Sequence, residues 1–263
     1  MSVNEKMMAL ADAIRNKTGE TQKLTLDAMA AAVEQVFEGG RQAAREDFWD
    51  SYQQMGNRTD YAGAFGGHGW NNELFFPKYA IRPTNAMYMF RTTKIAGDLE
   101  ALLQERGITL DFSECTNAVE LFSNAPDITR VGVVDMRKVT NASNAFAYCG
   151  VKTIDKVILS ENTSVMNFPG AATELEHLTV EGTIGKSGFD TRYCKKLNKE
   201  SIQSIVEALS TQTNGLNVTF SRDAVDNAFA EGSMENGDYL PGSMTSGWND
   251  MLELRPNWNM ELI

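Results

Sequence analysis

Apolar positions in residues 1–38 follow the spacing of two short helices. Met7, Leu10 and Ile14 fall on one face of the first helix, and the second is expected to end at the pair Gly39-Gly40. Two helices of this size bury too little apolar surface to be stable alone. We therefore expect residues 1–38 to pack on a partner or on copies of themselves.

Residues 39–82 are expected to form a helix followed by a connector rich in glycine and aromatic residues. The helix covers about Arg41 to Met55, with Trp49 on its apolar face. The connector, from Gly56 to Tyr79, carries large apolar side chains that flexible linkers lack. Its pattern is therefore typical of a packed irregular loop.

Short runs of β-branched or aromatic residues predict strands in the middle of the chain. These runs are Ile108–Phe112, Val133–Met136, Val157–Leu159, His177–Val180 and Asn217–Phe220. Two further helices are expected, one over Asp98–Glu105 and one that carries Ile202, Ile205, Val206 and Leu209.

The same region contains an internal repeat. The segment Thr84–Phe90 recurs as Thr116–Phe122, 32 residues later, and as Thr140–Phe146, after a further 24 residues. One strand, one turn and one buried aromatic ring in roughly every 20–29 residues is the period of leucine-rich repeats. The predicted fold class is therefore α+β, with an irregular leucine-rich-repeat-like solenoid over residues 83–222. A short helical N-terminal segment precedes it, and residues 223–263 form a C-terminal cap.

Two details bear on the regularity of this repeat. Three residues beyond each repeat Phe lies Thr93, Ala125 or Cys149, so Cys149 occupies a slot for small residues and is expected to be a buried, inert thiol. The region Thr163–Gly170 lacks the Phe position. Regular repetition is therefore not expected beyond about residue 160.

Several stretches carry a resemblance to known proteins. Thr140–Cys149 resembles the asparagine-rich BspA-type leucine-rich repeat, which is common in surface proteins and phages of gut bacteria. Leu10–Gly19 with Leu24–Met29 resembles the leader of phage and prophage structural proteins, and Leu197–Phe220 resembles the closing unit of repeat arrays in phage tail proteins. The resemblance implies a virion or tail protein that is anchored by residues 1–38 and displays its repeats for receptor binding.

The acidic charge balance narrows the range of partners. The formal net charge is −11 and the isoelectric point is about 4.8. Phosphate backbones and anionic membrane surfaces repel such a chain, so neither nucleic acid nor a membrane is an expected partner. The expected partners are other virion proteins through residues 1–38, further copies of the chain in a homo-oligomer, and a host-surface glycan or protein.

The sequence indicates neither a secretion signal nor a membrane span. The stretch Met1–Lys6 lacks the features of a signal peptide, and no run approaches the roughly 18 apolar residues of a membrane span. The expected location is the virion, after assembly in the host cytoplasm.

The three cysteines, Cys115, Cys149 and Cys194, are too widely spaced for a disulfide scaffold or a CxxC zinc site.

Two groups of residues are candidates for ligand binding. Asp111 and Asp135 occupy equivalent repeat positions, and on neighbouring strands they would lie about 4.8 Å apart, close enough to share a proton or bind a cation. Two solvated acids are the favoured interpretation, because no third acid joins them. Trp70 could stack on a sugar, with Asp60 and Tyr61 as polar neighbours, although a core or interface position is favoured for its ring.

The chain is therefore predicted to be a non-enzymatic phage or prophage virion or tail-associated structural protein, with no catalytic residue, metal or cofactor. Three alternatives remain. A bacterial leucine-rich-repeat surface adhesin should carry a signal peptide, and a tail-associated polysaccharide-degrading enzyme would have only Asp111 and Asp135 as candidate acids. The third is a purely architectural virion part without a ligand, for which the concave face of the solenoid would be buried in the assembled particle.

Overall fold

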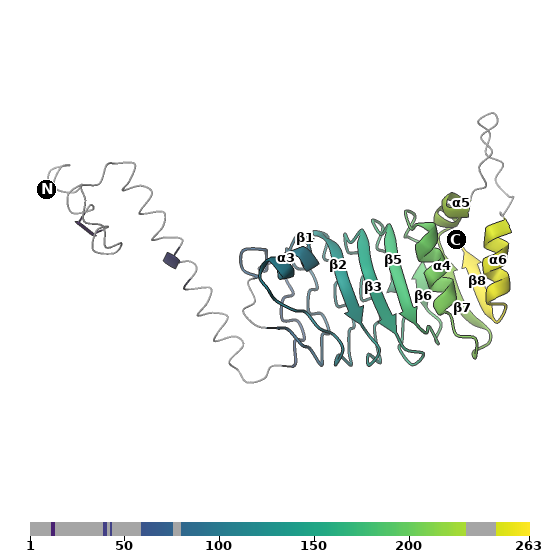
Figure 1. Cartoon of the computed structure of the whole chain (residues 1–263), viewed down its shortest axis with the longest axis horizontal. Coiled ribbons are helices and arrows are strands. Elements are labelled where there is room, and N and C mark those ends of the chain that lie inside the picture. The colour runs from purple at the N-terminus through teal and green to yellow at the C-terminus, as the bar shows by residue number, and fades with distance from the viewer. Residues whose placement is uncertain (1–11, 14–38, 41–42, 44–58, 76–79, 230–245) are drawn as a thin grey trace, which may run out of the picture. The chain divides into compact units, whose positions relative to one another are not determined.

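The computed structural model describes residues 12–13, 39–40, 43, 59–75, 80–229 and 246–263 (Figure 1). The chain divides into two compact units, Met1–Gly56 and Asn57–Ile263. The two helices expected in residues 1–38, and Trp49 in the next, lie almost wholly outside the described residues. Gly39 and Gly40 are themselves helical, so the expectation that this pair ends a helix is wrong.

The second unit contains two four-stranded sheets in which every pair of neighbouring strands is parallel. The first sheet has the order β1-β2-β3-β5 and the second has the order β4-β6-β7-β8 (Figure 1). The strands are β1 (Gly97–Asp98), β2 (Ile128–Asp135), β3 (Thr153–Leu159), β4 (Phe168–Pro169), β5 (His177–Gly182), β6 (Phe189–Thr191), β7 (Leu216–Phe220) and β8 (Trp258–Leu262). The helices are α3 (Leu99–Glu105), α4 (Lys199–Ala208), α5 (Arg222–Phe229) and α6 (Ser246–Leu254).

The predicted fold class is wrong. Instead of an α+β chain with a leucine-rich-repeat-like solenoid over residues 83–222, the structure has two four-stranded parallel sheets together with the helices α3 to α6, which is an α/β arrangement. The physical reason is that contacts between distant segments decide which strands join the same sheet, and a short apolar run does not encode those contacts. The run Ile108–Phe112 is also not a strand, since it contributes only the single bridge of Leu110 to Ile81.

Local elements agree better with the expectations. The other strand runs overlap β2, β3, β5 and β7, and the two expected helices are α3 and α4. Asp98 caps α3 by accepting a hydrogen bond from the backbone N–H of Ala101 at 2.9 Å. Asn198 caps α4 in the same way through the N–H of Ser201.

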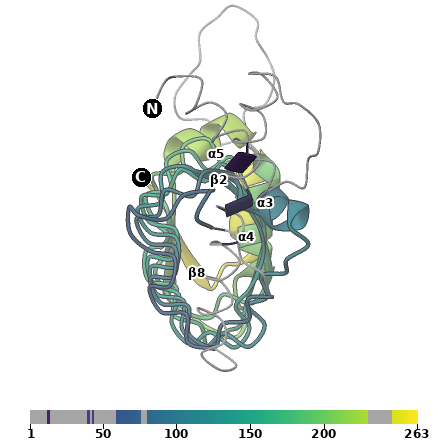
Figure 2. The same ribbon diagram turned by 90° about the vertical axis from the view of Figure 1, so that its left-hand side faces the viewer.

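The repeat copies lie one on another through a ladder of backbone hydrogen bonds. Asn85, Asn117 and Asn141 form successive parallel bridges, and in Figure 2 the turns of chain overlap along the view. Each Asn side chain accepts a hydrogen bond from the N–H two residues on, at 3.0–3.3 Å, which fixes the turn that follows. The ladder extends beyond these copies, because Asp60 bridges to Asn85 and Ser164 bridges to Asn141.

A row of buried phenylalanines runs beneath the ladder. Phe90, Phe122 and Phe146 stack at centroid distances of 5.0 and 5.2 Å, and Phe168 follows at 5.6 Å. The expectation that Thr163–Gly170 lacks the aromatic position is therefore wrong. Phe168 lies one residue before the position that aligns with the Phe of the other copies, and its ring still joins the row. Each ring is almost fully buried, which contributes roughly 2–3 kcal/mol by removal of apolar surface from water.

The C-terminal residues complete a second aromatic cluster. Trp248 is fully buried against Phe220 and Phe229, with centroids 5.5 and 5.9 Å away. Trp258 is 6% exposed, and its indole N–H donates to the carbonyl oxygen of Ser210 at 2.8 Å. Over the part of the chain that the structure describes, none of the helices has the length and apolar character that crossing a bilayer requires.

Candidate functional site

The first predicted group, around Trp70, lies at the start of the ladder. Tyr61 is 3% exposed, and its ring lies 6.1 Å from that of Phe65. Trp70 is half-buried and meets the same Phe65 ring edge-on at 5.4 Å. Asp60 is exposed and accepts the N–H of Ala62, as the repeat asparagines do. The structure thus brings the two aromatic rings together on Phe65 and gives Asp60 a turn-forming role.

Asp111 and Asp135 keep their equivalent turn positions, but each pairs with an arginine. Asp111 lies 3.7 Å from Arg82, and Asp135 lies 2.5 Å from Arg137. The hydrogen bond from Arg137, more than any other interaction, lowers the pKa of Asp135 from its usual value. A general acid for glycoside hydrolysis needs a raised pKa, so Asp135 has the wrong electrostatic environment for that role.

The cysteines are buried, and their thiols have low reactivity. Burial raises the pKa of the Cys149 thiol to about 12, and it raises the pKa values of Cys115 and Cys194 as well. A thiol with a raised pKa is a poor nucleophile and a poor metal ligand at neutral pH. Among the described residues, no group of three or more His, Cys, Asp or Glu side chains is placed to hold a metal ion.

A different surface stands out, on the outer side of the repeat turns. The residue two positions beyond each repeat Phe has a left-handed backbone, with φ of 57° at Thr92, 54° at Asn124 and 58° at Tyr148. Gly67, two positions beyond Phe65, has φ of 88°. These residues are stacked in one column, because the turns that carry them are joined layer by layer.

Beyond Tyr148, the left-handed position of the next turn is Gly170, two residues after Phe168, with φ of 80°. Gly170 lies against the preceding layer, since a side-chain carbon on Gly170 would meet Ala147 at 3.1 Å. In the layer after that, Cys194 reaches back to Gly170, with its sulfur 3.6 Å from that carbonyl oxygen, and Tyr193 precedes Cys194 as Tyr148 precedes Cys149. We call the two exposed turn residues Tyr148 and Tyr193 the tyrosine column.

Both tyrosine side chains of the column are exposed to solvent. Tyr148 is 65% exposed and Tyr193 is 52% exposed. A left-handed backbone costs a bulky residue roughly 1–2 kcal/mol, and an exposed ring recovers little of that cost through packing. Tyr148 is therefore a strained residue whose side chain contributes little to the core.

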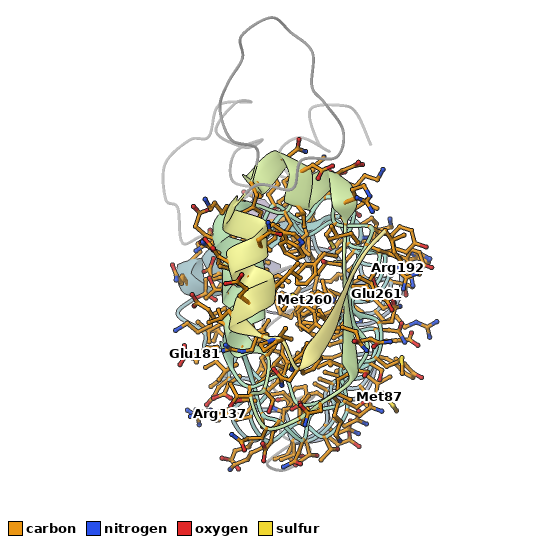
Figure 3. The ribbon with its side chains drawn as sticks, turned by 90° about the vertical axis from the view of Figure 1, so that its right-hand side faces the viewer. Met87, Arg137, Glu181, Arg192, Met260 and Glu261 are labelled. Atoms are coloured by element: carbon orange, nitrogen blue, oxygen red, sulfur yellow. The ribbon has the colours of Figure 1, made fainter. Side chains whose placement is uncertain are left out.

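Polar groups adjoin Tyr193. Arg192 donates from Nε to the carboxylate of Asp190 at 2.8 and 3.0 Å. This hydrogen bond is the largest cause of a raised pKa at Arg192, to which the nearby Tyr193 and Glu261 also contribute. Figure 3 shows Arg192 and Glu261 on the side of the second unit away from Glu181 and Arg137.

The opposite side carries a different chemistry. There, charged side chains pair across neighbouring strands of the first sheet: Lys156 lies 2.6 Å from Glu181, and Arg130 joins Asp98 to Asp155 at 2.8 and 2.7 Å. These charges are satisfied within the fold. The tyrosine column thus supplies the aromatic side chains that are more than half exposed among the described residues.

The expectations from the sequence did not include this column. Tyr148 entered only as part of the repeat motif Thr140–Cys149, and Tyr193 was not singled out. The available signal was that Tyr148 occupies a turn position where another copy has Asn124. Comparison of the chain with protein-family models, with curated proteins and with solved structures finds no match.

Proposed function

We propose that this chain is a non-enzymatic virion or tail-associated protein of a phage or prophage, and that its second unit binds a molecule on the host surface. Support comes from two sources. Leu10–Gly19 with Leu24–Met29 resembles the leader of phage and prophage structural proteins, and Thr140–Cys149 resembles a BspA-type repeat that is common in surface proteins and phages of gut bacteria. The tyrosine column supplies a surface of the kind that recognition requires, with exposed aromatic rings next to polar groups.

The observation that carries this proposal is the conformation of Tyr148. Its φ is 58° and its side chain is 65% exposed. Strained backbone persists where the surrounding structure enforces it, and strain at an exposed ring is typical of sites selected for binding. A purely architectural role gives no reason to keep a tyrosine where asparagine fits better.

In this proposal the two units have different tasks. Residues 1–38 attach the chain to other virion proteins and to its own copies, and the second unit is displayed. The hydrogen-bonded ladder and the phenylalanine row suit display, because they hold the tyrosine column on a fixed backbone. Rigid presentation reduces the conformational entropy that is lost on binding.

Two measurements test the proposal. Antibody against the chain should label particles purified from an induced culture of the strain that carries the gene. The purified full-length protein should bind cells of strains that those particles infect, and should not bind resistant strains. Particles without the chain, or equal binding to infected and resistant strains, would contradict the virion role or the recognition role respectively.

Variants then assign binding to the column. Tyr148→Asn should reduce cell binding, since asparagine is compatible with the left-handed backbone but removes the ring. Tyr88→Asn is the matched control: Tyr88 is also left-handed, with φ of 59°, but its ring lies under Arg91 outside the column. Equal losses in the two variants would argue against a specific role for Tyr148.

A further inference from the structure

We infer that strand β8, at the edge of the second sheet, pairs in the antiparallel direction with β8 of a second copy of this chain, about a two-fold axis at Met260. The inference adds a second contact to the proposed assembly through residues 1–38, and it rests on that assembly for bringing the copies together. Three features carry it: an unpaired strand edge, an apolar end of the fold and a strand sequence that matches itself.

The free edge belongs to the last strand in the order of its sheet. β8 pairs with β7 on one side, from Leu216 with Trp258 to Phe220 with Leu262. On its other side, no strand among the described residues lies next to it. Figure 3 shows β8 in front at this end of the second unit. An unpaired edge presents backbone N–H and C=O groups that can bond to another strand.

The first sheet shows how this fold covers such an edge internally. No strand follows β5 in that sheet, but α4 packs there. The hydroxyl of Ser201 accepts a hydrogen bond from the N–H of Leu178 at 2.8 Å, and the hydroxyl of Ser204 accepts one from the N–H of Val180 at 3.2 Å. Within the part of the chain that the structure describes, β8 has no helix that bonds to its backbone in this way.

The end of the fold beside β8 carries exposed apolar side chains. Met260 and Leu262 are only half-buried, although they alternate along β8 with exposed polar residues and so lie on its apolar face. Leu254, at the end of α6, is 43% exposed, and Ile263 is 57% exposed. Exposed apolar side chains next to an unpaired strand edge favour association with another surface.

The sequence of β8 makes a second β8 a matching occupant. Residues that lie opposite each other in an antiparallel pair point to the same face of the sheet. With the axis at Met260, Trp258 meets Leu262 of the second copy, and Asn259 meets its Glu261. Apolar residues therefore meet apolar residues along the whole strand, and each carboxylate faces a neutral amide. An axis at Glu261 would instead place two carboxylates opposite each other, which is unfavourable.

The size of this contact explains why it depends on residues 1–38. The edge of a five-residue strand is smaller than the roughly 800 Å² that each partner contributes to a stable protein interface. A second contact between copies that are already joined benefits from a high effective concentration. We therefore expect β8 pairing in the full-length oligomer, and separate chains when residues 1–38 are removed.

Cysteine cross-linking of the full-length chain tests the pairing. In Met260→Cys the two thiols would lie opposite each other, with Cα atoms about 4.5–5.5 Å apart, which is within the range of a disulfide. Mild oxidation with diamide should therefore give a covalent dimer. The unmodified chain should give none, because its own cysteines are buried.

Asn259→Cys is the matched control on the same strand. Its two Cα atoms would lie about 8 Å apart, too far for a disulfide. A mixture of Asn259→Cys and Glu261→Cys chains, assembled together, should nevertheless form a mixed covalent dimer, because these positions lie opposite each other in the inferred register.

Charge at position 259 gives a second readout, measured as the rate of dimer formation in the Met260→Cys chain. Asn259→Glu should slow it at least about fivefold, because like charges then lie opposite each other twice in the dimer. Asn259→Lys should not slow it, because it faces the carboxylate of Glu261. Thr129→Glu adds the same charge at an exposed position on β2 and should leave the rate within about twofold. Circular dichroism of each variant checks that the fold is retained.

The outcomes separate this inference from the proposed function. A full-length oligomer in which Met260→Cys gives no covalent dimer would overturn the β8 pairing and leave the assembly through residues 1–38 in place; another occupant of the edge would give this result. Equal cross-linking of Met260→Cys and Asn259→Cys would overturn the register. A monomeric full-length chain would overturn the assembly role, and absence of the cross-link at raised protein concentration would then overturn the pairing as well.

Discussion

Tyr148 and Asn124 occupy the same place in successive turns, and both have a left-handed backbone, with φ of 58° and 54°. Asparagine tolerates this conformation because its short polar side chain can bond locally, whereas a tyrosine there is strained. The two copies thus adopt the same left-handed backbone with different side chains, and only Tyr148 lowers the free energy of unfolding.

The first prediction is that Tyr148→Asn stabilises the protein. We expect the free energy of unfolding to rise by about 0.5–1 kcal/mol, because strain is relieved and little packing is lost. Urea unfolding of the two proteins measures this difference. Tyr193→Asn is the control, since the backbone of Tyr193 is not left-handed and no gain is expected there. A loss of stability in Tyr148→Asn would show that the ring packs in a way its exposure does not suggest.

A second prediction concerns the phenylalanine row. Phe122 lies at its centre, 5.0 Å from Phe90 and 5.2 Å from Phe146, and it is 1% exposed. Phe122→Ala should lower the free energy of unfolding by about 3–5 kcal/mol, through lost burial and the cavity left behind. Phe122→Leu keeps most of the volume and should cost less than about 2 kcal/mol. Similar losses in the two variants would mean that neighbouring side chains move into the space left by Phe122→Ala, and would contradict a rigidly packed row.

Part of the fold could be predicted from the sequence. The repeat gave the layer positions of Asn85, Asn117 and Asn141, because the side-chain chemistry of each turn is local. The helices α3 and α4 followed from apolar spacing and caps for the same reason. Sheet pairing was not predictable in this way, because the register and direction of parallel strands depend on contacts between distant segments.

Two features were missed for a different reason. The first copy, Asp60–Gly67, has Gly63 and Gly67 where later copies have Tyr88 and Thr92, so identity of residue type does not reveal it. What the copies share is a positive φ, which glycine and a strained side chain can both supply. The tyrosine column was missed because the type of a residue does not determine its solvent exposure in the folded chain. The position of Tyr193 also depends on how the layers stack, which the sequence does not show.

A third prediction tests how closely the layers approach. A side-chain carbon on Gly150 would overlap the backbone carbonyl of Pro126 in the preceding layer. Gly150→Ala should therefore lower the free energy of unfolding by about 1–3 kcal/mol, because one of two backbones must shift. Gly69→Ala is the control, since no atom lies within 4 Å of the added carbon. Thermal unfolding of both variants is sufficient, and a Gly150→Ala protein as stable as the control would contradict the close approach.

A fourth prediction concerns residues 1–38, for which the sequence predicts two helices too small to form a core alone. The mass of the full-length protein in solution should be that of a defined oligomer, and removal of residues 1–38 should give a monomer. Light scattering coupled to gel filtration measures both. A monomeric full-length chain would show that this segment does not drive self-association. An oligomer that persists after the truncation would show that the interface lies elsewhere in the chain.

The last prediction follows from the charged triad on the first sheet. Arg130, on β2, binds Asp98 and Asp155 on the two flanking strands at 2.8 and 2.7 Å. Burial tends to raise the pKa of Asp98, but hydrogen bonds from the N–H of Ala101 and from Arg130 outweigh it, so the folded-state pKa lies below the usual value. A carboxyl group with a depressed folded pKa stabilises the fold above its unfolded pKa, near 4, and loses that contribution as the pH falls through the folded pKa.

Arg130→Gln should therefore destabilise the protein at pH 7 by no more than about 1 kcal/mol, because all three side chains are partly exposed to solvent. The difference between the two proteins should shrink as the pH is lowered below about 4, because Asp98 becomes protonated as the pH falls through its lowered folded-state pKa. Urea unfolding at a series of pH values measures it. Lys138→Gln is the control, since both side chains of the Lys138–Glu114 pair are more than half exposed. A difference that stays constant from pH 7 to pH 3 would mean that Arg130 stabilises the sheet by packing of its aliphatic stem and not by its charge.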